Sequence, residues 1–146
     1  MLVALEAPEL IFVHAGVVAY EGKALLLPGR TFAGKSTLVA ALVRAGADYY
    51  SDEFAPLDAE GRVHPFAKPL SVRNENYLQV NESVSALGGR AGELPAPVGA
   101  VVFAAYRARA RWRPRELSRG EATLALLDNT LPARTRPEQA LQVLTR

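Results

Sequence analysis

The stretch "KALLLPGRTFAGKSTLVAALVRAG", Lys23 to Gly46, predicts a strand, a phosphate-binding loop and a helix in succession. The run Leu25–Leu27 has no polar alternation, which is typical of a central strand with both faces buried. From Lys35 to Ala45 apolar residues recur at helical spacing, and Gly46 follows where helices commonly end in a left-handed residue. The apolar positions that carry the helical spacing are Leu38, Ala41, Leu42 and Ala45.

The loop between the predicted strand and helix matches the pattern G-x-x-x-x-G-K-[ST]. Its glycines allow backbone N–H groups to surround phosphate oxygens, and the start of the helix adds a positive partial charge. The lysine reaches the outer phosphates, and the serine hydroxyl can bind Mg²⁺. The alternative is a glycine-rich turn that binds nothing. We expect a nucleotide to be bound by Gly29, Arg30, Thr31, Phe32, Ala33, Gly34, Lys35 and Ser36, with Thr37 in the first helical turn.

The segments on either side of this stretch predict further strands and turns. Before it, "LIFVHAGVVAY" from Leu10 to Tyr20 is rich in β-branched and aromatic residues, and Glu21-Gly22 predicts a tight turn into the next strand. Beyond it the predicted elements are one or two strands at 48–58, a turn at 59–61, a short strand at 70–73, a weak helix at 77–87 and a buried strand at 98–106.

Two helices are expected to close the chain, each begun by a capping box. Ser118 and Glu121 form the first box, and Thr135 and Glu138 form the second. A chain of 146 residues is long enough for one hydrophobic core and too short for two. The expected fold is therefore a single α/β domain over residues 1–146.

The composition excludes several classes of protein. The chain is 49% hydrophobic and 22% charged, which is typical of a globular domain. No apolar run approaches the roughly 20 residues that cross a bilayer, and the N-terminal stretch has acidic Glu6 and Glu9 but no basic segment of a signal peptide. The chain has no cysteine, so disulfides and thiolate metal sites are excluded. We expect a cytoplasmic protein without a membrane partner.

Two adjacent carboxylates, Asp52 and Glu53, follow Lys35 by little more than the length of a helix. A right-handed crossover would place the strand that carries them alongside the phosphate-loop strand, with its carboxyl end beside the phosphates. Because strand side chains alternate, the two acids should point to opposite faces. We predict that Asp52 is a general base or assists the metal, and that Glu53 acts on Mg²⁺ through water. The alternative is a solvated turn with two surface acids.

An arginine strip occupies the segment from Ala104 to Arg119, where six arginines and one glutamate give a local charge of +5 in a chain of +2. At strand spacing the arginines from Arg107 to Arg115 would share one face. They would then form a solvated edge strand, or they would reach the transferring phosphoryl group or an acidic substrate. Nucleic acid is the weakest of the three interpretations, because only Tyr106 and Trp112 offer stacking platforms.

The segment "VHAGVVAYEGKALLLPGRTFAGKSTLVAALVRAGADYYSDE", Val13 to Glu53, resembles the catalytic domain of HPr kinase/phosphorylase and its shorter relatives. The similarity extends to about Arg73 and continues weakly through "VVFAAYRARARWRPRELSRGEATLALL". The resemblance implies a P-loop kinase domain of the type found in HPr kinase and phosphoenolpyruvate carboxykinase, with a twisted mixed sheet. The implied activity is phosphoryl transfer from Mg²⁺-ATP to a hydroxyl on a protein serine or a small molecule.

The resemblance also implies roles for individual residues. Gly29 to Ser36 would bind ATP and Mg²⁺, Asp52 would be the catalytic base, and Glu53 would take the second acidic position. His14 would stand near the acidic pair and orient it. A lone histidine in an apolar strand is also often a packed core residue.

The sequence departs from this family in ways that leave other functions open. Ser71, in "LSVRN", stands where HPr kinases carry a further metal-binding glutamate, and the loop that grips HPr is not recognisable. The elements that relatives carry beyond the last helix could come from another subunit of a homo-oligomer, or they could be dispensed with. A nucleotide-binding switch without transfer activity is one alternative. A shikimate-type small-molecule kinase is another, although its phosphate-loop strand normally lies closer to the N-terminus.

Overall fold

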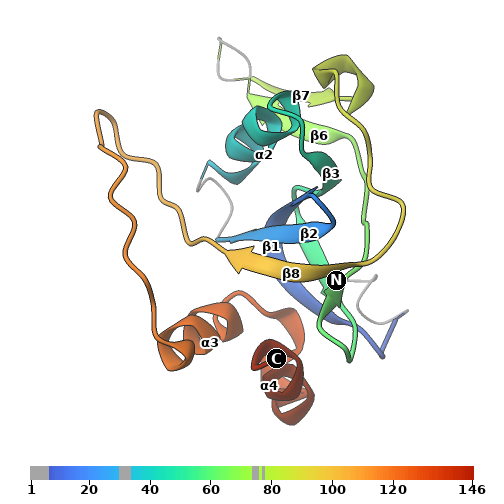
Figure 1. Ribbon diagram of the computed structural model, residues 1–146, viewed down its shortest axis with the longest axis vertical. Helices are drawn as coiled ribbons and strands as arrows, with labels where there is room; N and C mark the ends of the chain where they lie inside the picture. The colour runs from blue at the N-terminus through green and yellow to red at the C-terminus, as the bar shows by residue number, and fades with distance from the viewer. Residues whose placement is uncertain (1–6, 30–33, 74–75, 77) are drawn as a thin grey trace.

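The computed structural model describes residues 7–29, 34–73, 76 and 78–146 as a mixed α/β fold with a mixed sheet (Figure 1). The described strands are β1 (Ile11–Tyr20), β2 (Lys23–Pro28), β3 (Asp48–Ser51), β4 (Phe54–Leu57), β5 (Arg62–Val63), β6 (Leu70–Arg73), β7 (Gln79–Glu82) and β8 (Ala96–Val101). The described helices are α2 (Lys35–Arg44), α3 (Arg119–Leu127) and α4 (Pro137–Leu144), with 3₁₀ turns η1 (Ser85–Leu87) and η2 (Leu131–Arg134).

The predicted hairpin before the phosphate loop is confirmed. β1 and β2 are antiparallel, with Val18 opposite Leu25. Glu21 and Gly22 connect them with φ values of 49° and 76°. Two successive left-handed residues form the turn whose twist matches that of paired strands, and Gly22 adopts this conformation without steric cost.

Five strands, of which β1 is one, pair with one another in a closed ring. The N-terminal half of β1 pairs with β4, and its C-terminal half pairs with β2 and β3. β2 then pairs in parallel with β8, and the ring returns to β1 through β5 and β4. The prediction that the strand before Asp52 lies beside the phosphate-loop strand is therefore wrong. β3 pairs with β1 instead, because β1 and β8 already occupy the two edges of β2.

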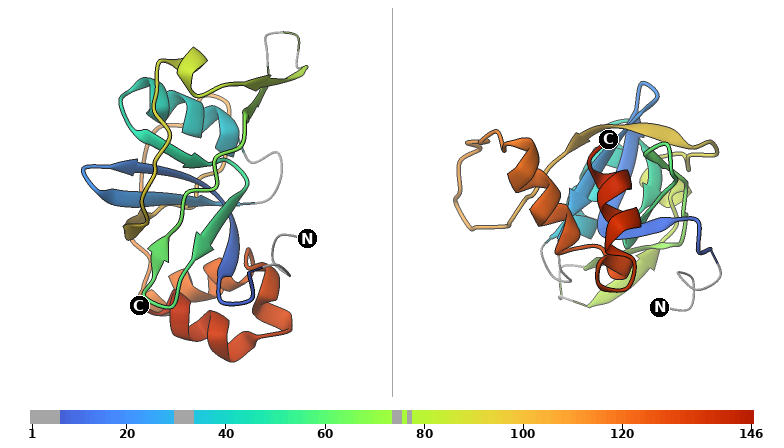
Figure 2. Two further views of the ribbon diagram at one scale, coloured as in Figure 1. Left: turned by 90° about the vertical axis from the view of Figure 1, so that its right-hand side faces the viewer. Right: turned by 90° about the horizontal axis from the view of Figure 1, so that it is seen from below.

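Hydrophobic cores lie on both faces of the central sheet. In Figures 1 and 2 α2 lies on one side of the strands, and α3 and α4 lie on the other. Alternate residues of β1, such as Val13 and Val17, join the core beside α3 and α4, whereas Val18 joins the core beneath α2. In β2, Leu26 joins the core beside α3 and α4, and Leu27 joins the core beneath α2. The predicted central strand is confirmed, since a strand covered on both faces needs apolar residues at successive positions.

Helix α2 begins and ends as predicted, but a different stripe of it is buried. Gly46 has a φ of 108°, and the N–H groups of Gly46 and Ala47 donate to Val43 and Leu42, which is a Schellman cap. The helix is closest to β1 at Gly16, where an added Cβ would lie 2.6 Å from Val39 Cγ2. Because of this contact, the residues of α2 that face the sheet are not the ones that the helical spacing predicted. Its buried apolar residues are Val39, Ala40 and Val43, whereas Leu38 and Leu42 are half-buried and Ala41 and Ala45 are exposed.

Two predicted elements after residue 73 differ in the structure: most of the weak helix is not helical, and the buried strand is shorter and largely exposed. The stretch 79–82, within the predicted weak helix 77–87, is strand β7, which pairs with β6, and only 85–87 form a 3₁₀ turn; Tyr77 lies outside the described residues. The predicted buried strand 98–106 is β8 at Ala96–Val101, and most of its side chains are exposed. Strand pairing satisfies backbone groups and does not require both faces to be covered, so an apolar run alone does not establish burial.

The arginine strip is not a strand. Residues 102–118 form no described helix or strand, and they reverse at a turn at Ala108–Arg109, where Arg109 has a φ of 60°. We call this segment the arginine arm. It projects from the body between β8 and α3 (Figures 1 and 2). The alternation of arginines therefore places them on no common strand face.

The closing helices differ in how they begin. The capping box of Ser118 and Glu121 at α3 is confirmed. The box predicted at Thr135 is wrong, because the N-cap of α4 is Arg136 and Pro137 occupies the first turn, where its fixed φ suits a helix start. None of the described helices has the length and apolar character needed to span a membrane.

Gly92→Ala is expected to lower the free energy of unfolding by about 1–3 kcal/mol. A Cβ at this position would overlap the ring of Tyr50, whose hydroxyl donates to the Leu94 carbonyl at 2.6 Å and holds the ring in place. Urea denaturation measures the change. Gly120→Ala in α3 is the control, because nothing lies within 4 Å of its added Cβ. Equal losses in the two variants would contradict the packing argument.

Candidate functional site

The phosphate-loop motif lies between the end of β2 and the start of α2, as the sequence predicts. Arg30, Thr31, Phe32 and Ala33 lie outside the described residues, and Gly29, Gly34, Lys35, Ser36 and Thr37 lie within them. Gly34 precedes α2 with a left-handed φ of 81°. Lys35 is only 9% exposed, and its Nζ donates to the Gly29 carbonyl at 2.7 Å. The lysine amine therefore lies next to the first glycine of the motif.

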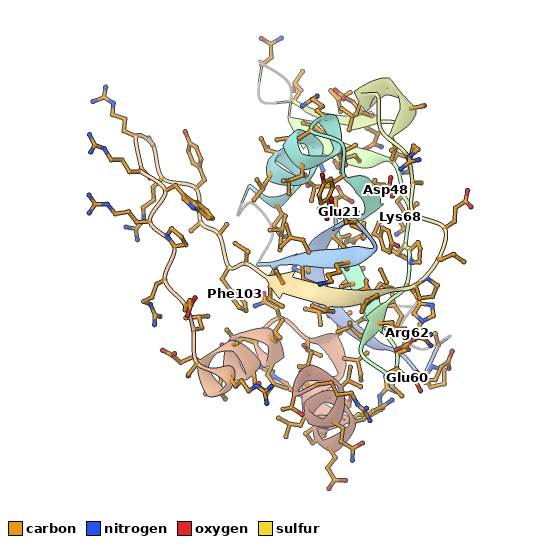
Figure 3. All side chains as sticks on the ribbon, viewed as in Figure 1. Glu21, Asp48, Glu60, Arg62, Lys68 and Phe103 are labelled. Carbon is orange, nitrogen blue, oxygen red and sulfur yellow. The ribbon has the colours of Figure 1, made fainter. Side chains whose placement is uncertain are left out.

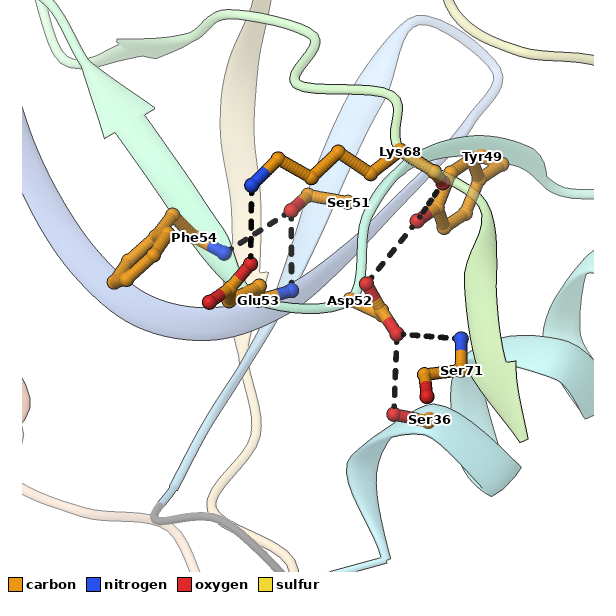
Figure 4. Close-up of polar contacts among 8 residues, drawn as sticks. All are labelled: Ser36, Tyr49, Ser51, Asp52, Glu53, Phe54, Lys68 and Ser71. Carbon is orange, nitrogen blue, oxygen red and sulfur yellow. Dashed lines mark hydrogen bonds and ion pairs between the residues drawn. The ribbon is translucent and has the colours of Figure 1, made fainter. Parts of the chain in front are cut away.

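Asp52 lies in the bend between β3 and β4 and accepts three hydrogen bonds (Figure 4). Its Oδ2 accepts from Ser36 Oγ at 3.3 Å and from the Ser71 N–H at 3.1 Å, and its Oδ1 accepts from the Tyr49 hydroxyl at 3.3 Å. The hydroxyl expected to bind Mg²⁺ and the expected acidic residue are thus brought together. Residues far apart in the sequence, on α2, β3 and β6, hold the carboxylate in one orientation.

Glu53 points away from Asp52 (Figure 4). Its Oε2 lies 3.5 Å from Lys68 Nζ, and its side chain is 48% exposed. The two acids diverge, as expected, but the cause is a turn and not a strand pleat. Ser51 Oγ accepts the N–H groups of Glu53 and Phe54 at 3.2 and 3.0 Å and bends the chain between the two strands.

His14 lies between the phosphate loop and the acidic bend. Its carbonyl accepts the Gly29 N–H at 3.3 Å, and the next residue, Ala15, donates its N–H to the Glu53 carbonyl at 3.1 Å. The His14 and Phe54 rings are 5.6 Å apart. Burial and the positive charge of Lys35 lower the pKa of His14, and Glu53 and a hydrogen bond to the Gly29 backbone oppose this shift. The imidazole is therefore favoured in its neutral form at neutral pH.

Burial also shifts the pKa of two residues that surround Asp52. It lowers the pKa of Lys35, and the negative charge of Asp52 partly opposes this change. Burial and the Asp52 charge both raise the pKa of Tyr49, so its hydroxyl keeps its proton and can donate it. The Tyr49 hydroxyl also lies 2.9 Å from the Lys68 carbonyl, which is a second acceptor. These two residues give the site one amine and one hydroxyl donor with fixed positions.

Three contributors to this site were missed by the sequence predictions. Tyr49 and Lys68 carry no motif, and Ser71 takes part through its backbone N–H, which any residue except proline offers. Ser71 therefore occupies the place of the expected glutamate without supplying a carboxylate. The described residues contain no group of three or more His, Cys, Asp or Glu side chains able to hold a metal ion by themselves. Ser36 Oγ, which donates to Asp52, is a described oxygen atom that could hold Mg²⁺ beside a nucleotide, and the role of Glu53 on the metal stays a prediction.

One hollow is lined by residues of the motif, and a second is lined by His14, whose carbonyl contacts Gly29. A small one at the start of α2 is lined by Leu27, Pro28, Gly34, Lys35, Leu38 and Ala104. A wider, open one of about 310 Å³, which we call the β1–α3 hollow, is lined by His14, Phe54, Asp128, Asn129, Thr130 and Leu131. The base of the arginine arm reaches the first hollow through Ala104, and Tyr106 Cβ lies 3.6 Å from where a Gly34 Cβ would be.

Beyond its base, the arginine arm leaves the body of the molecule. The side chains of its arginines are exposed, as are Tyr106 and Trp112 at 83% and 77%. Arg115 pairs with Glu121 of α3 at 3.3 Å. Figure 3 shows nitrogen-tipped side chains spreading away from the sheet along this segment, with Phe103 at its base. The expectation that its arginines approach the phosphates therefore stays a prediction.

His14 should make stability fall as the pH falls below 6.5, its ordinary pKa. Because its pKa is lower in the folded chain, the unfolded chain binds more protons in this range, and the free energy of unfolding decreases as the pH falls. Urea denaturation at several pH values should show a shallower decrease in His14→Gln than in the wild type. His64→Gln is the control and should keep the His14 contribution. An NMR titration midpoint for His14 at or above 6.5 would contradict the assignment.

Comparison of the chain with protein-family models, with curated proteins and with solved structures finds no match.

Proposed function

We propose that this protein transfers a phosphoryl group from Mg²⁺-ATP to a hydroxyl group. The observation that carries the proposal is the hydrogen bond between Ser36 Oγ and Asp52 Oδ2, formed beside the amine of Lys35. A serine hydroxyl at the start of a helix, a carboxylate on that hydroxyl and a lysine amine are the groups that bind Mg²⁺ and nucleotide phosphates in P-loop proteins. The resemblance to HPr kinase/phosphorylase supports the same activity.

Each group has a defined task in this proposal. Bound Mg²⁺-ATP would supply the transferable phosphoryl group and neutralise its charge. The loop N–H groups and Lys35 position the phosphates, and Ser36 would hold the metal. Asp52 then accepts the proton of the attacking hydroxyl. Catalysis arises mainly from positioning and from charges fixed in advance, because the protein forms no covalent bond to the phosphoryl group. Such an enzyme belongs in the cytoplasm, where ATP is supplied.

A nucleotide-dependent switch is the second candidate function. The contact of Asp52 with the backbone of Ser71 favours it, because an HPr kinase would have a metal-binding glutamate at this position. A switch would bind the nucleotide at the same loop and would transfer nothing. The two functions therefore share the predictions for nucleotide binding and differ only in those for transfer.

Lys35→Ala is expected to weaken ATP binding by at least about 100-fold, because it removes the buried amine that faces the phosphate loop. Isothermal titration calorimetry with Mg²⁺-ATP measures the affinity. Lys23→Ala is the matched control, since this exposed lysine lies at the opposite end of β2. Unchanged affinity in the Lys35 variant would remove the nucleotide site from this loop.

Asp52→Asn should keep nucleotide affinity within a few fold and lower the transfer rate by about 10²–10⁴. The amide is close to the carboxylate in size, but it cannot accept the proton. Asp48→Asn is the control, because this aspartate begins β3, the strand that precedes Asp52, and pairs with Arg90. Full transfer by the Asp52 variant would refute the assignment of the base.

Incubation of the wild-type protein with γ-labelled ATP and a cell extract separates the kinase from the switch. A kinase should label a component of the extract, and the Lys35→Ala protein should label none. Nucleotide binding without labelled product would support the switch.

A further inference from the structure

We infer that the β1–α3 hollow binds the acceptor, and that this acceptor carries an ammonium or guanidinium group close to the hydroxyl that receives the phosphoryl group. The inference rests on the proposed transfer activity and names the chemical class of its substrate.

The hollow is connected to the phosphate loop through His14. His14 lines it, and the same residue contacts Gly29 through its carbonyl and lies within electrostatic reach of Lys35. Phe54, the Cα partner of His14 across β1 and β4, follows the acidic bend by one residue. A compound held in the hollow would therefore meet the bound nucleotide across His14.

The wall formed by residues 128–131 is fixed to the sheet. The Asn129 carbonyl accepts the His14 N–H at 2.7 Å, and Thr130 forms a bridge with Val13. Thr130 Oγ1 donates to Leu126 at 2.7 Å, and Asn129 Nδ2 donates to Ala125 at 2.9 Å. These bonds satisfy the end of α3 and hold the wall before any ligand binds, so little ordering is needed on binding.

The charge of the wall selects a cation. Asp128 is the C-cap of α3, where the helix dipole is already negative, and the last turn of the helix has no basic residue. Its exposed carboxylate forms no ion pair with any described residue. The other described lining residues carry no positive charge, since the pKa of His14 is lowered. A carboxylate placed at this end of a helix is unfavourable by itself and becomes favourable beside a bound cation.

An aromatic ring at the hollow completes a cation site. Phe54 is held by edge contacts with Phe12 and Phe66, whose ring centroids lie 6.4 and 6.3 Å away. The face of such a ring attracts ammonium and guanidinium groups. The arginine arm joins the other end of α3, at Arg119, so its positive charge enters at the opposite end of the helix from Asp128. An anionic acceptor would meet Asp128 first and be repelled.

The transfer itself conserves all atoms and charges. The acceptor oxygen forms a bond to the γ-phosphorus, and the bond from this phosphorus to the bridging oxygen of ADP breaks. The hydroxyl proton moves to Asp52. The products are ADP and a phosphate ester that retains its cation. Serine beside a lysine or arginine in a peptide, and a small amino alcohol, present the same chemistry.

Matched acceptors test the inference with γ-labelled ATP. One pair is the peptide Ala-Lys-Ser-Ala and its counterpart Ala-Glu-Ser-Ala, both acetylated at the N-terminus and amidated at the C-terminus, and the other is ethanolamine and ethylene glycol. We expect the cationic member of at least one pair to be preferred by about three- to tenfold or more in kcat/KM. Labelling of the peptide, of ethanolamine or of both identifies the source of the acceptor. Equal use of both members, or preference for the acidic or neutral member, overturns the inference.

Asp128→Asn should remove most of this preference by raising KM for the cationic acceptor, with kcat and ATP affinity nearly unchanged. Glu93→Gln is the control, because this exposed acid lies in the loop before β8 and outside the hollow. A preference that survives Asp128→Asn overturns the inference.

An NMR titration tests the hollow without relying on transfer. Ethanolamine and Ala-Lys-Ser-Ala should shift the amide signals of Asn129 and Thr130 in the wild type and much less in Asp128→Asn. Absence of shifts with both probes overturns the inference even if ATP is bound and hydrolysed. Loss of ATP binding or of all transfer, with these shifts retained, would instead reject the proposed function.

Discussion

The fold depends on main-chain hydrogen bonding along both edges of β1. This ten-residue strand pairs with β2, β3 and β4, and its Ile11, Val13, Ala15 and Val17 are fully buried. Because β1 and β8 occupy both edges of β2, β3 pairs with the other edge of β1. The acidic bend is thus separated from the phosphate loop by β1. His14 therefore lies between the loop and the bend. The position of the site follows from this one strand.

Close approach of α2 to β1 is the second requirement. Gly16 leaves space for Val39, and this contact sets the stripe of α2 that faces the sheet. Lys35 lies on the buried side of the helix, whereas Ser36 is turned toward Asp52. Within the described residues, every buried polar side-chain atom has a hydrogen-bond partner. The polar groups of the site are thus held in place without leaving a described buried side-chain atom unsatisfied.

The two ends of α3 have opposite electrostatic character. The arginine arm enters at its N-terminus, where Arg115 pairs with the capping Glu121. Its C-terminus carries Asp128 and turns back to β1 through Asn129. Charges of opposite sign are therefore separated by the length of one short helix, on the side of the sheet away from α2. A molecule that approaches the phosphate loop from this side meets positive charge at the N-terminus of α3 and negative charge at its C-terminus.

Local patterns in the sequence were sufficient for much of the architecture. The hairpin turn at Glu21-Gly22, the cap at Gly46 and the capping box at Ser118 each depend on residues adjacent in the chain, and all three are confirmed. The same holds for the phosphate-loop motif between a strand and a helix. Interactions within one turn or one hairpin depend on local geometry, which a short stretch of sequence specifies.

Long-range pairing was beyond the reach of those patterns. The partner of β3, the stripe of α2 that is buried, the exposure of β8 and the strand at 79–82 all depend on which segments meet, and no short window contains both partners. The apolar run and the alternating arginines before α3 were compatible with a strand, but residues 102–118 pair with none of the described strands. Likewise, Ser71 reaches Asp52 through a backbone N–H, and backbone groups leave no mark in a sequence. Residue types thus specified the chemistry that the chain can offer, and competition among strands for the edges of β1 and β2 set where that chemistry is assembled.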